Sequence, residues 1–330
     1  MARRRAESLS VNRTLIERMG HLGYGAAPIG NLYREISDEQ AEESLNAAWG
    51  GGVRYFDTAP HYGLGLSEQR LGKFLAAKPR ADYVVSTKVG RVLESNPNFD
   101  GGDDRDQGFI VPNRLIRRFD PSDFGIRKSI DDSLERLGLG RIDIAYLHDP
   151  DVYDLDRGLR EGLPALERVR EEGIVGAIGI GTNDASAALR AVREGDIDVV
   201  MIAGRYTLLE QPALQELLPA CLERGVSVVA AAVYNSGLLA TPIPSPTSHY
   251  NYEVPEQEVF DRASRLAQVC QDAGVELPTA ALQYPLQHPA VQTVVVGSAR
   301  AQAVRENIAR LTSHVPASLW DTLREARLIP

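Results

Sequence analysis

The 330-residue chain contains little cysteine and no long apolar run. Its two cysteines, Cys221 and Cys270, are too few and too far apart for a disulfide framework, and both fall in helical patterns that would bury them. No stretch reaches the ~20 apolar residues that a membrane-spanning helix needs. No apolar segment follows the basic N-terminus, as one would in a secretion signal. These absences indicate a reducing compartment, and we expect the cytoplasm.

Positive charge is scarce as well. Lysine and arginine number 36 against 45 aspartates and glutamates, which gives a net charge of −9. Nucleic acids and anionic membranes attract basic surfaces, so this balance argues against both as partners. The run Arg3-Arg4-Arg5 is the exception, and we interpret residues 1–15 as a flexible N-terminal segment. Residues 16–330 are expected to form one domain.

The motifs of several enzyme classes are missing. The chain has no P-loop, no HExxH zinc motif and no GxSxG nucleophile elbow. Two segments approach the dinucleotide-binding GxGxxG pattern, but Pro28 and Asp184 stand where its third glycine is required. We therefore expect no metal centre. An open doubly wound sheet, which would carry the GxGxxG pattern after its first strand, is a less favoured fold than a closed barrel.

Short β-rich segments alternate with amphipathic helical segments along the chain. Several predicted strands are apolar throughout, which is typical of strands buried on both faces of a parallel sheet. Eight strands with intervening helices predict a single closed (β/α)8 TIM barrel. The strands are expected at 27–32, 53–57, 83–88, 142–148, 175–181, 198–203, 227–232 and 291–297. The helices are expected at 38–49, where Ser37 is a plausible cap, and at 67–75, 121–137, 158–171, 184–193, 212–223 and 257–273.

Two long loops interrupt the regular spacing, at 90–119 and 237–255. Loops of this length on the C-terminal face of a barrel usually shape or cover the substrate site. Tyr250 and Tyr252 in the second loop are candidates for part of a lid, although aromatic anchoring of the loop explains them equally well.

Four polar residues fall at or just after the ends of consecutive predicted strands. Asp57 and Tyr62 follow the second strand, Lys88 ends the third, and His148 ends the fourth. The C-terminal ends of barrel strands form the active-site floor, so the four side chains would meet there. The alternative is a structural Asp–Lys ion pair with an unrelated tyrosine and histidine.

These four residue types together suit proton transfer. A tyrosine hydroxyl ordinarily has a pKa of about 10, too high for free proton exchange at neutral pH. We expect Lys88 to lower the pKa of Tyr62, Asp57 to hold Lys88, and His148 to hydrogen-bond the reacting oxygen.

With this set of residues, the chain resembles the aldo-keto reductase family along nearly its whole length. The resemblance implies that Asp57, Tyr62, Lys88 and His148 form a catalytic tetrad. It also implies a nicotinamide cofactor bound over the barrel mouth without a GxGxxG motif. The residues implied for the cofactor are Thr182 and Asn183 at the nicotinamide, Tyr234, Asn235, Ser236 and Gly237 at the pyrophosphate, and Gly297, Ser298, Glu306 and Asn307 at the adenosine.

Several positions depart from the family pattern. Ala203 and Ala231 stand where glutamine and tyrosine are common, and Gly297 and Ala303 where members that select NADP carry lysine or arginine. A 2′-phosphate favours basic partners, so this pattern favours NAD over NADP. Arg300 and Arg305 leave NADP open.

The segments 203–211 and 234–239 resemble a narrower branch of the family, which comprises D-threo-aldose (L-fucose) 1-dehydrogenases and pyridoxal 4-dehydrogenases. The resemblance implies oxidation of a sugar hemiacetal to its lactone. Pyridoxal oxidation, general aldehyde or ketone reduction, and a non-catalytic nucleotide-binding regulatory subunit are the alternatives. A small carbonyl or hemiacetal compound is the expected partner, and a monomer or small homo-oligomer the expected state. Candidate substrate contacts are Tyr24, Tyr33, His61 and Arg205.

Overall fold

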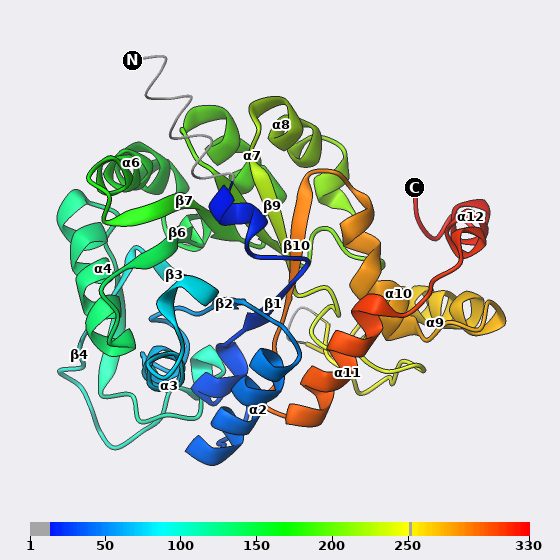
Figure 1. Cartoon of the computed structure of the whole chain (residues 1–330), viewed down its shortest axis with the longest axis horizontal. Helices are drawn as coiled ribbons and strands as arrows, with labels where there is room; N and C mark the ends of the chain where they lie inside the picture. Colours follow the sequence, from blue (N-terminus) through cyan, green and yellow to red (C-terminus); the bar gives the residue numbers. More distant parts are fainter. Residues whose placement is uncertain (1–13, 251–252) are drawn as a thin grey trace.

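The computed structural model describes residues 14–250 and 253–330. Eight parallel strands close into a barrel in the order β1-β10-β9-β8-β7-β6-β3-β2, and helices surround it (Figure 1). This confirms the predicted (β/α)8 fold. The barrel strands are β1 (Leu22–Gly25), β2 (Tyr55–Asp57), β3 (Val84–Val89), β6 (Ile142–His148), β7 (Val175–Thr182), β8 (Val199–Ala203), β9 (Ser227–Ala231) and β10 (Val291–Val296).

The first barrel strand lies earlier in the chain than predicted. Residues 27–32 were expected to form it, but Ala27–Gly30 is a 3-10 helix, η1, with proline in its first turn. Proline has no amide hydrogen to donate to a central sheet ladder. The strand itself contains Gly23 and Gly25, at which an added Cβ would press on the side chains of Tyr55 and Val295 from neighbouring strands. Close packing therefore requires glycine at these positions, which gives the strand a weak apolar signal.

Seven helices fall where the sequence predicts them, to within a few residues. Ser37 caps the first with a reciprocal capping box to Gln40, and Ser122 caps the third. The predicted helix 158–171 begins with a π-helical turn, η5 (Gly158–Gly162). The predicted helix 212–223 begins as a separate 3-10 turn, η6 (Pro212–Leu214). The seven are α2 (Asp38–Gly50), α3 (Leu66–Leu75), α4 (Asp123–Leu137), α6 (Leu163–Glu171), α7 (Ala185–Glu194), α8 (Leu217–Arg224) and α9 (Gln257–Asp272).

Several further elements were not predicted. The long loop after β3 contains an antiparallel hairpin of β4 (Arg91–Ser95) and β5 (Leu115–Phe119). Near the C-terminus, α11 packs beside α2 and completes the outer ring, whereas α9 and α12 lie at its periphery (Figure 1). The C-terminal helices are α10 (Leu277–Gln283), α11 (Ala301–Thr312) and α12 (Ala317–Glu325).

The N-terminal segment covers the barrel interior at the end where the strands begin. Leu15, Ile16 and Met19 are buried with Tyr55 and other inward-facing strand residues in one apolar cluster. Of the segment predicted to be flexible, residues 1–13 lie outside the described part of the chain, and Leu15 is only 8% exposed.

The two cysteines lie in the helical shell. Cys221 on α8 and Cys270 on α9 are both buried and free, as expected. Among the described residues, no helix is both long and apolar enough to cross a membrane.

Candidate active site

Asp57, Tyr62 and Lys88 are joined by direct hydrogen bonds at one end of the barrel. Strands β2, β3 and β6 are neighbours, so the residues at their C-terminal ends meet there. Lys88 Nζ lies 2.7 Å from Oδ2 of Asp57 and 2.9 Å from the Tyr62 hydroxyl. The second Asp57 oxygen accepts from Ser86 Oγ at 2.7 Å. The His148 ring lies 6.1 Å from the Tyr62 ring, perpendicular to it. The structure thus brings together all four residues that the sequence singled out.

Backbone contact between two glycines positions Tyr62. Gly63 has a left-handed φ of 63°, and a Cβ at this position would collide with the backbone oxygen of Gly30 in η1. Gly30 in turn lies against the backbone of Tyr62. The turn after β2 is therefore pressed against η1, which orients the tyrosine toward Lys88.

Burial dominates the electrostatics of the Tyr62 hydroxyl. The pKa of Tyr62 is raised to about 12, because loss of hydration outweighs the opposing effect of Lys88. The expectation that its pKa would fall is therefore wrong for the protein alone, although Lys88 acts in the predicted direction. Asp57 and Tyr62 together raise the pKa of Lys88 above its ordinary value despite its burial, so the lysine stays charged.

Two neutral histidines line the site. Burial, together with nearby arginines and Lys88, lowers the pKa of His148 well below its ordinary value and that of His61 to about 2. The His61 ring lies 5.6 Å from that of His148 and 6.0 Å from that of Tyr62. The Nδ1 atoms of both histidines are buried and have no hydrogen-bond partner in the described part of the chain. His61, a predicted substrate contact, therefore lies beside the tetrad with one ring nitrogen unpartnered.

Three further residues of the site were not foreseen. Phe109, in the loop between β4 and β5, lies 5.3 Å from the His61 ring and 6.1 Å from the Tyr62 ring. Arg91 donates to Asp149 at 2.6 Å, and Asp149 follows His148 directly. The position of Asp149 after a strand-end histidine was the one available signal. Arg91 lies close to the site because it follows Lys88 by three residues, whereas Phe109 reaches the site because the long loop folds back toward it.

The other predicted substrate contacts have different surroundings. Tyr24 is wrong as a mouth residue: it is 2% exposed, packs beside Phe56, and its hydroxyl bonds Ser44 and the carbonyl of Ser298. Its side chain points out of the barrel toward α2. Tyr33 is 57% exposed and stacks on His249 of the late loop at 6.2 Å.

The residues implied for a cofactor lie along the opposite half of the barrel rim. They follow β7, β9 and β10, whereas the tetrad follows β2, β3 and β6. Tyr234 donates to Asn307 at 2.8 Å, which joins the loop after β9 to α11. Asn235 is 3% exposed, has a left-handed φ of 46°, and neither polar side-chain atom has a partner within the residues described.

An unpartnered buried amide is costly, so Asn235 fits a polar group bound at this loop. The remaining implied residues have varied exposure. Thr182 is buried and donates to Asp151 at 2.6 Å, while Asn183, Gly297 and Glu306 are exposed at the rim. Ser236 and Gly237 continue the left-handed backbone after Asn235, and Ser298 is half-buried. These groups could hold a dinucleotide across the barrel mouth.

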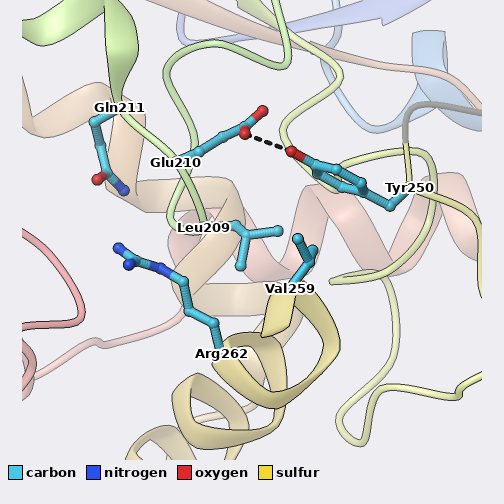
Figure 2. A pocket seen from close by; sticks show the side chains of 6 residues that line it. All are labelled: Leu209, Glu210, Gln211, Tyr250, Val259 and Arg262. Atoms are coloured by element: carbon cyan, nitrogen blue, oxygen red, sulfur yellow. Dashed lines mark hydrogen bonds between the residues drawn. The ribbon is translucent and has the colours of Figure 1, made fainter. Parts of the chain in front are cut away.

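The late loop is fastened to the β8 side of the rim. The Tyr250 hydroxyl donates to Glu210 at 2.6 Å, beside an open hollow of about 300 Å³ that contains no tetrad residue (Figure 2). Glu210 also accepts from Arg205, whose Nε donates to the carbonyl of Asn183 at 2.8 Å. Arg205, a predicted substrate contact, thus connects the late loop to an implied cofactor residue. Tyr252 lies outside the described residues.

Comparison with known families decides the classification. A model of the aldo/keto reductase family matches residues 21–327. The chain belongs to the aldo/keto reductase family. It is therefore an oxidoreductase that uses NAD(P) and acts on a small carbonyl compound.

Individual members of the family show which enzymes this chain is similar to. A D-threo-aldose 1-dehydrogenase from a Pseudomonas species is 54% identical over 94% of both chains. A pyridoxal 4-dehydrogenase from Microbacterium luteolum is 36% identical over 93% of this chain and 94% of its own. Among solved structures, an aldo-keto reductase from Bacillus halodurans superposes with a TM-score of 0.72 at 26% identity, covering 94% of this chain and 92% of that one. These comparisons confirm the predicted resemblance to the aldose and pyridoxal dehydrogenase branch.

Proposed function

We propose that this aldo/keto reductase oxidises a sugar hemiacetal of the L-fucose or D-threo-aldose type to its lactone, with NAD as the hydride acceptor. The observation that carries the proposal is the hydrogen-bond chain from Asp57 through Lys88 to the Tyr62 hydroxyl, beside neutral His148. The relative that is 54% identical and named for D-threo-aldoses supports the sugar.

The reaction removes a proton from the C1 hydroxyl and a hydride from C1, the anomeric carbon of the sugar. The phenolate form of Tyr62 takes the proton of the C1 hydroxyl. A nicotinamide held at the barrel mouth would supply the acceptor for the hydride that leaves C1. The C1–oxygen bond becomes a carbonyl, and because the ring oxygen stays attached to C1, the product is a lactone. Charged Lys88 stabilises the phenolate, and His148 orients the same substrate oxygen.

The proposed preference for NAD rests on missing charge at the adenosine end. Gly297 and Ala303 offer no cation to a 2′-phosphate, which carries close to two negative charges. Arg300 and Arg305 flank this region, so a direct comparison of kcat/KM for NAD and NADP is the test. A clear preference for NADP would overturn this part of the proposal.

A substrate panel tests the reaction itself. We expect reduced nicotinamide to form from L-fucose or D-arabinose, and Tyr62→Phe to lower turnover by about 10²–10⁴-fold while NAD still binds. Tyr206→Phe is the matched control, since Tyr206 is buried against Tyr284 in the shell and is expected to keep near-normal turnover. NAD binding by the wild-type protein without turnover of any carbonyl or hemiacetal would instead indicate a regulatory subunit.

Pyridoxal is the second candidate substrate, because the relative named for it is 36% identical over nearly the whole chain. Including pyridoxal in the same panel separates the two. A kcat/KM for pyridoxal well above that for every aldose would replace the sugar by pyridoxal and leave the chemistry at Tyr62 unchanged.

A further inference from the structure

Asp149 adopts a backbone conformation that holds its carboxylate beside the catalytic histidine. It follows the last residue of β6 and has a left-handed φ of 39° and ψ of 57°. Such values are uncommon for residues other than glycine, and asparagine and aspartate tolerate them best. The amide of Asp149 donates to Gly181 at 2.8 Å, continuing the pairing of β6 with β7. Its Oδ2 atom lies 3.4 Å from Nε2 of His148.

Arg91 forms an ion pair with this carboxylate. The guanidinium donates to Oδ2 of Asp149 at 2.6 Å and lies 5.1 Å from the centre of the Tyr153 ring. Arg91 begins β4, whose pairing with Phe119 of β5 fixes its backbone. The side chain of Arg91 is 6% exposed and that of Asp149 is 25% exposed. The open side of the ion pair is therefore the carboxylate.

The carboxylate is within electrostatic range of the reacting oxygen. Its negative charge is among the influences that raise the pKa of Tyr62. His148 is close to both residues: its Nε2 atom lies 3.4 Å from the Asp149 carboxylate, and its ring lies 6.1 Å from the Tyr62 ring. A substrate whose C1 oxygen contacts Tyr62 and His148 would thus have the groups next to C1 within reach of Asp149.

We propose that Asp149, held by Arg91, accepts a hydrogen bond from the hydroxyl on the carbon adjacent to the reacting carbon, and so selects α-hydroxylated substrates. This inference rests on the proposed sugar oxidation. Hydrogen bonds to a charged acceptor are stronger than neutral ones, and a site built around such a bond rejects an analogue that lacks the hydroxyl. Asp149 is thereby a specificity-determining residue, distinct from the four that carry out the proton chemistry.

A pair of sugars differing only at this hydroxyl tests the role. D-arabinose and its 2-deoxy analogue, 2-deoxy-D-ribose, share the same remaining stereocentres. We expect the wild-type protein with NAD to prefer D-arabinose by about 10–100-fold in kcat/KM. In Asp149→Asn the preference falls to within about threefold, because the neutral amide oxygen is a weaker acceptor than the carboxylate, so kcat/KM falls on D-arabinose and is kept on the deoxy sugar. Asparagine suits the left-handed backbone at this position.

The outcomes separate the possible roles of Asp149. An equal loss on both sugars would overturn the proposal, because a residue that acts only through His148 affects every substrate alike. A wild-type preference below threefold would overturn it without any variant, so the test does not depend on whether Asp149→Asn folds. Glu94→Gln is the matched control: it removes a half-exposed carboxylate from the same β4 strand and is expected to leave the preference unchanged. Failure of the wild type to oxidise any aldose would instead refute the proposed function.

Discussion

Lys88 and Asp57 form a buried ion pair in which Nζ and Oδ2 are 2.7 Å apart and both side chains are 3% exposed. The same ammonium donates to the carbonyl of Thr58 and to the hydroxyl of Tyr62. Asp57 uses its other oxygen on Ser86. The pair is therefore fully hydrogen-bonded, which offsets part of the free-energy cost of burying two charged side chains.

Removing one member of this pair is expected to destabilise the fold strongly. Lys88→Met leaves the Asp57 carboxylate buried without its cation, and we expect the free energy of unfolding to fall by about 3–5 kcal/mol in urea titrations. The exposed pair of Arg193 and Glu216 is the control, and Arg193→Met should cost less than about 1 kcal/mol. Equal effects of the two substitutions would contradict the role assigned to burial.

The raised pKa of Tyr62 predicts its ionisation state in the protein without cofactor. With a pKa of about 12, the phenol stays protonated at neutral pH. At pH values below this pKa, the phenolate fraction increases about tenfold for each unit by which the pH rises. We expect no phenolate absorbance from Tyr62 below about pH 10, measured as the difference between wild-type protein and Tyr62→Phe. A difference signal titrating near neutral pH would show that Lys88 outweighs burial.

The two neutral histidines predict a loss of stability in mild acid. His61 and His148 have lower pKa values in the folded protein than the ordinary 6.5, so the unfolded chain binds more protons below that pH. Their effect is absent above about pH 7, and stability then falls by about 1.4 kcal/mol per pH unit for each histidine as the pH drops further.

Urea unfolding at a series of pH values from about 7 to 5 measures this slope. His61→Gln should remove about half of it. His314→Gln, at an exposed position on the C-terminal side of α11, is the control. An unchanged slope in His61→Gln would mean that the imidazole is hydrated in the folded protein.

The contact between Gly30 and Gly63 predicts a substitution that damages both stability and activity. Gly63→Ala combines a positive φ with a collision against backbone, and we expect a loss of about 2 kcal/mol or more together with reduced kcat as Tyr62 shifts. Gly225 is the matched control, because it has a φ of 68° at the end of α8 but nothing within 4 Å of an added Cβ. Gly225→Ala should cost about 1 kcal/mol and leave kcat unchanged. Equal losses would show that φ alone matters.

The parts of the fold that were predictable have signals local to the chain. The apolar segment 142–148 became β6 without a change of bounds, and Ser37 caps α2 as expected. β1 was missed because close packing against Tyr55 and Val295 of the neighbouring strands requires its two glycines, and the local sequence of β1 contains no sign of that packing. The β4–β5 hairpin was missed because the loop that contains it has mixed polarity.

Some residues of the candidate site could likewise be predicted from the sequence, and others could not. Asp57, Lys88 and His148 lie at the C-terminal ends of neighbouring barrel strands, so their meeting follows from parallel register. Tyr24 was misplaced because the first strand was expected at 27–32, so its position on β1, with its side chain on the outer face, was not predicted. Phe109 lies far along the chain from His61 and Tyr62, and only the folded loop brings it to them.

The amino-acid sequence by itself determined the barrel, the choice of the four residues proposed to react and the resemblance to aldo/keto reductases. These follow from the hydrophobic pattern and from chain order, which any parallel barrel converts into position. The tertiary structure decided the balance of charge and burial at Tyr62, the contact of Tyr24 with Ser298, and the pairing of Arg91 with Asp149. Each of these depends on distances between segments far apart in the chain, and hydration and Coulomb energies vary with those distances.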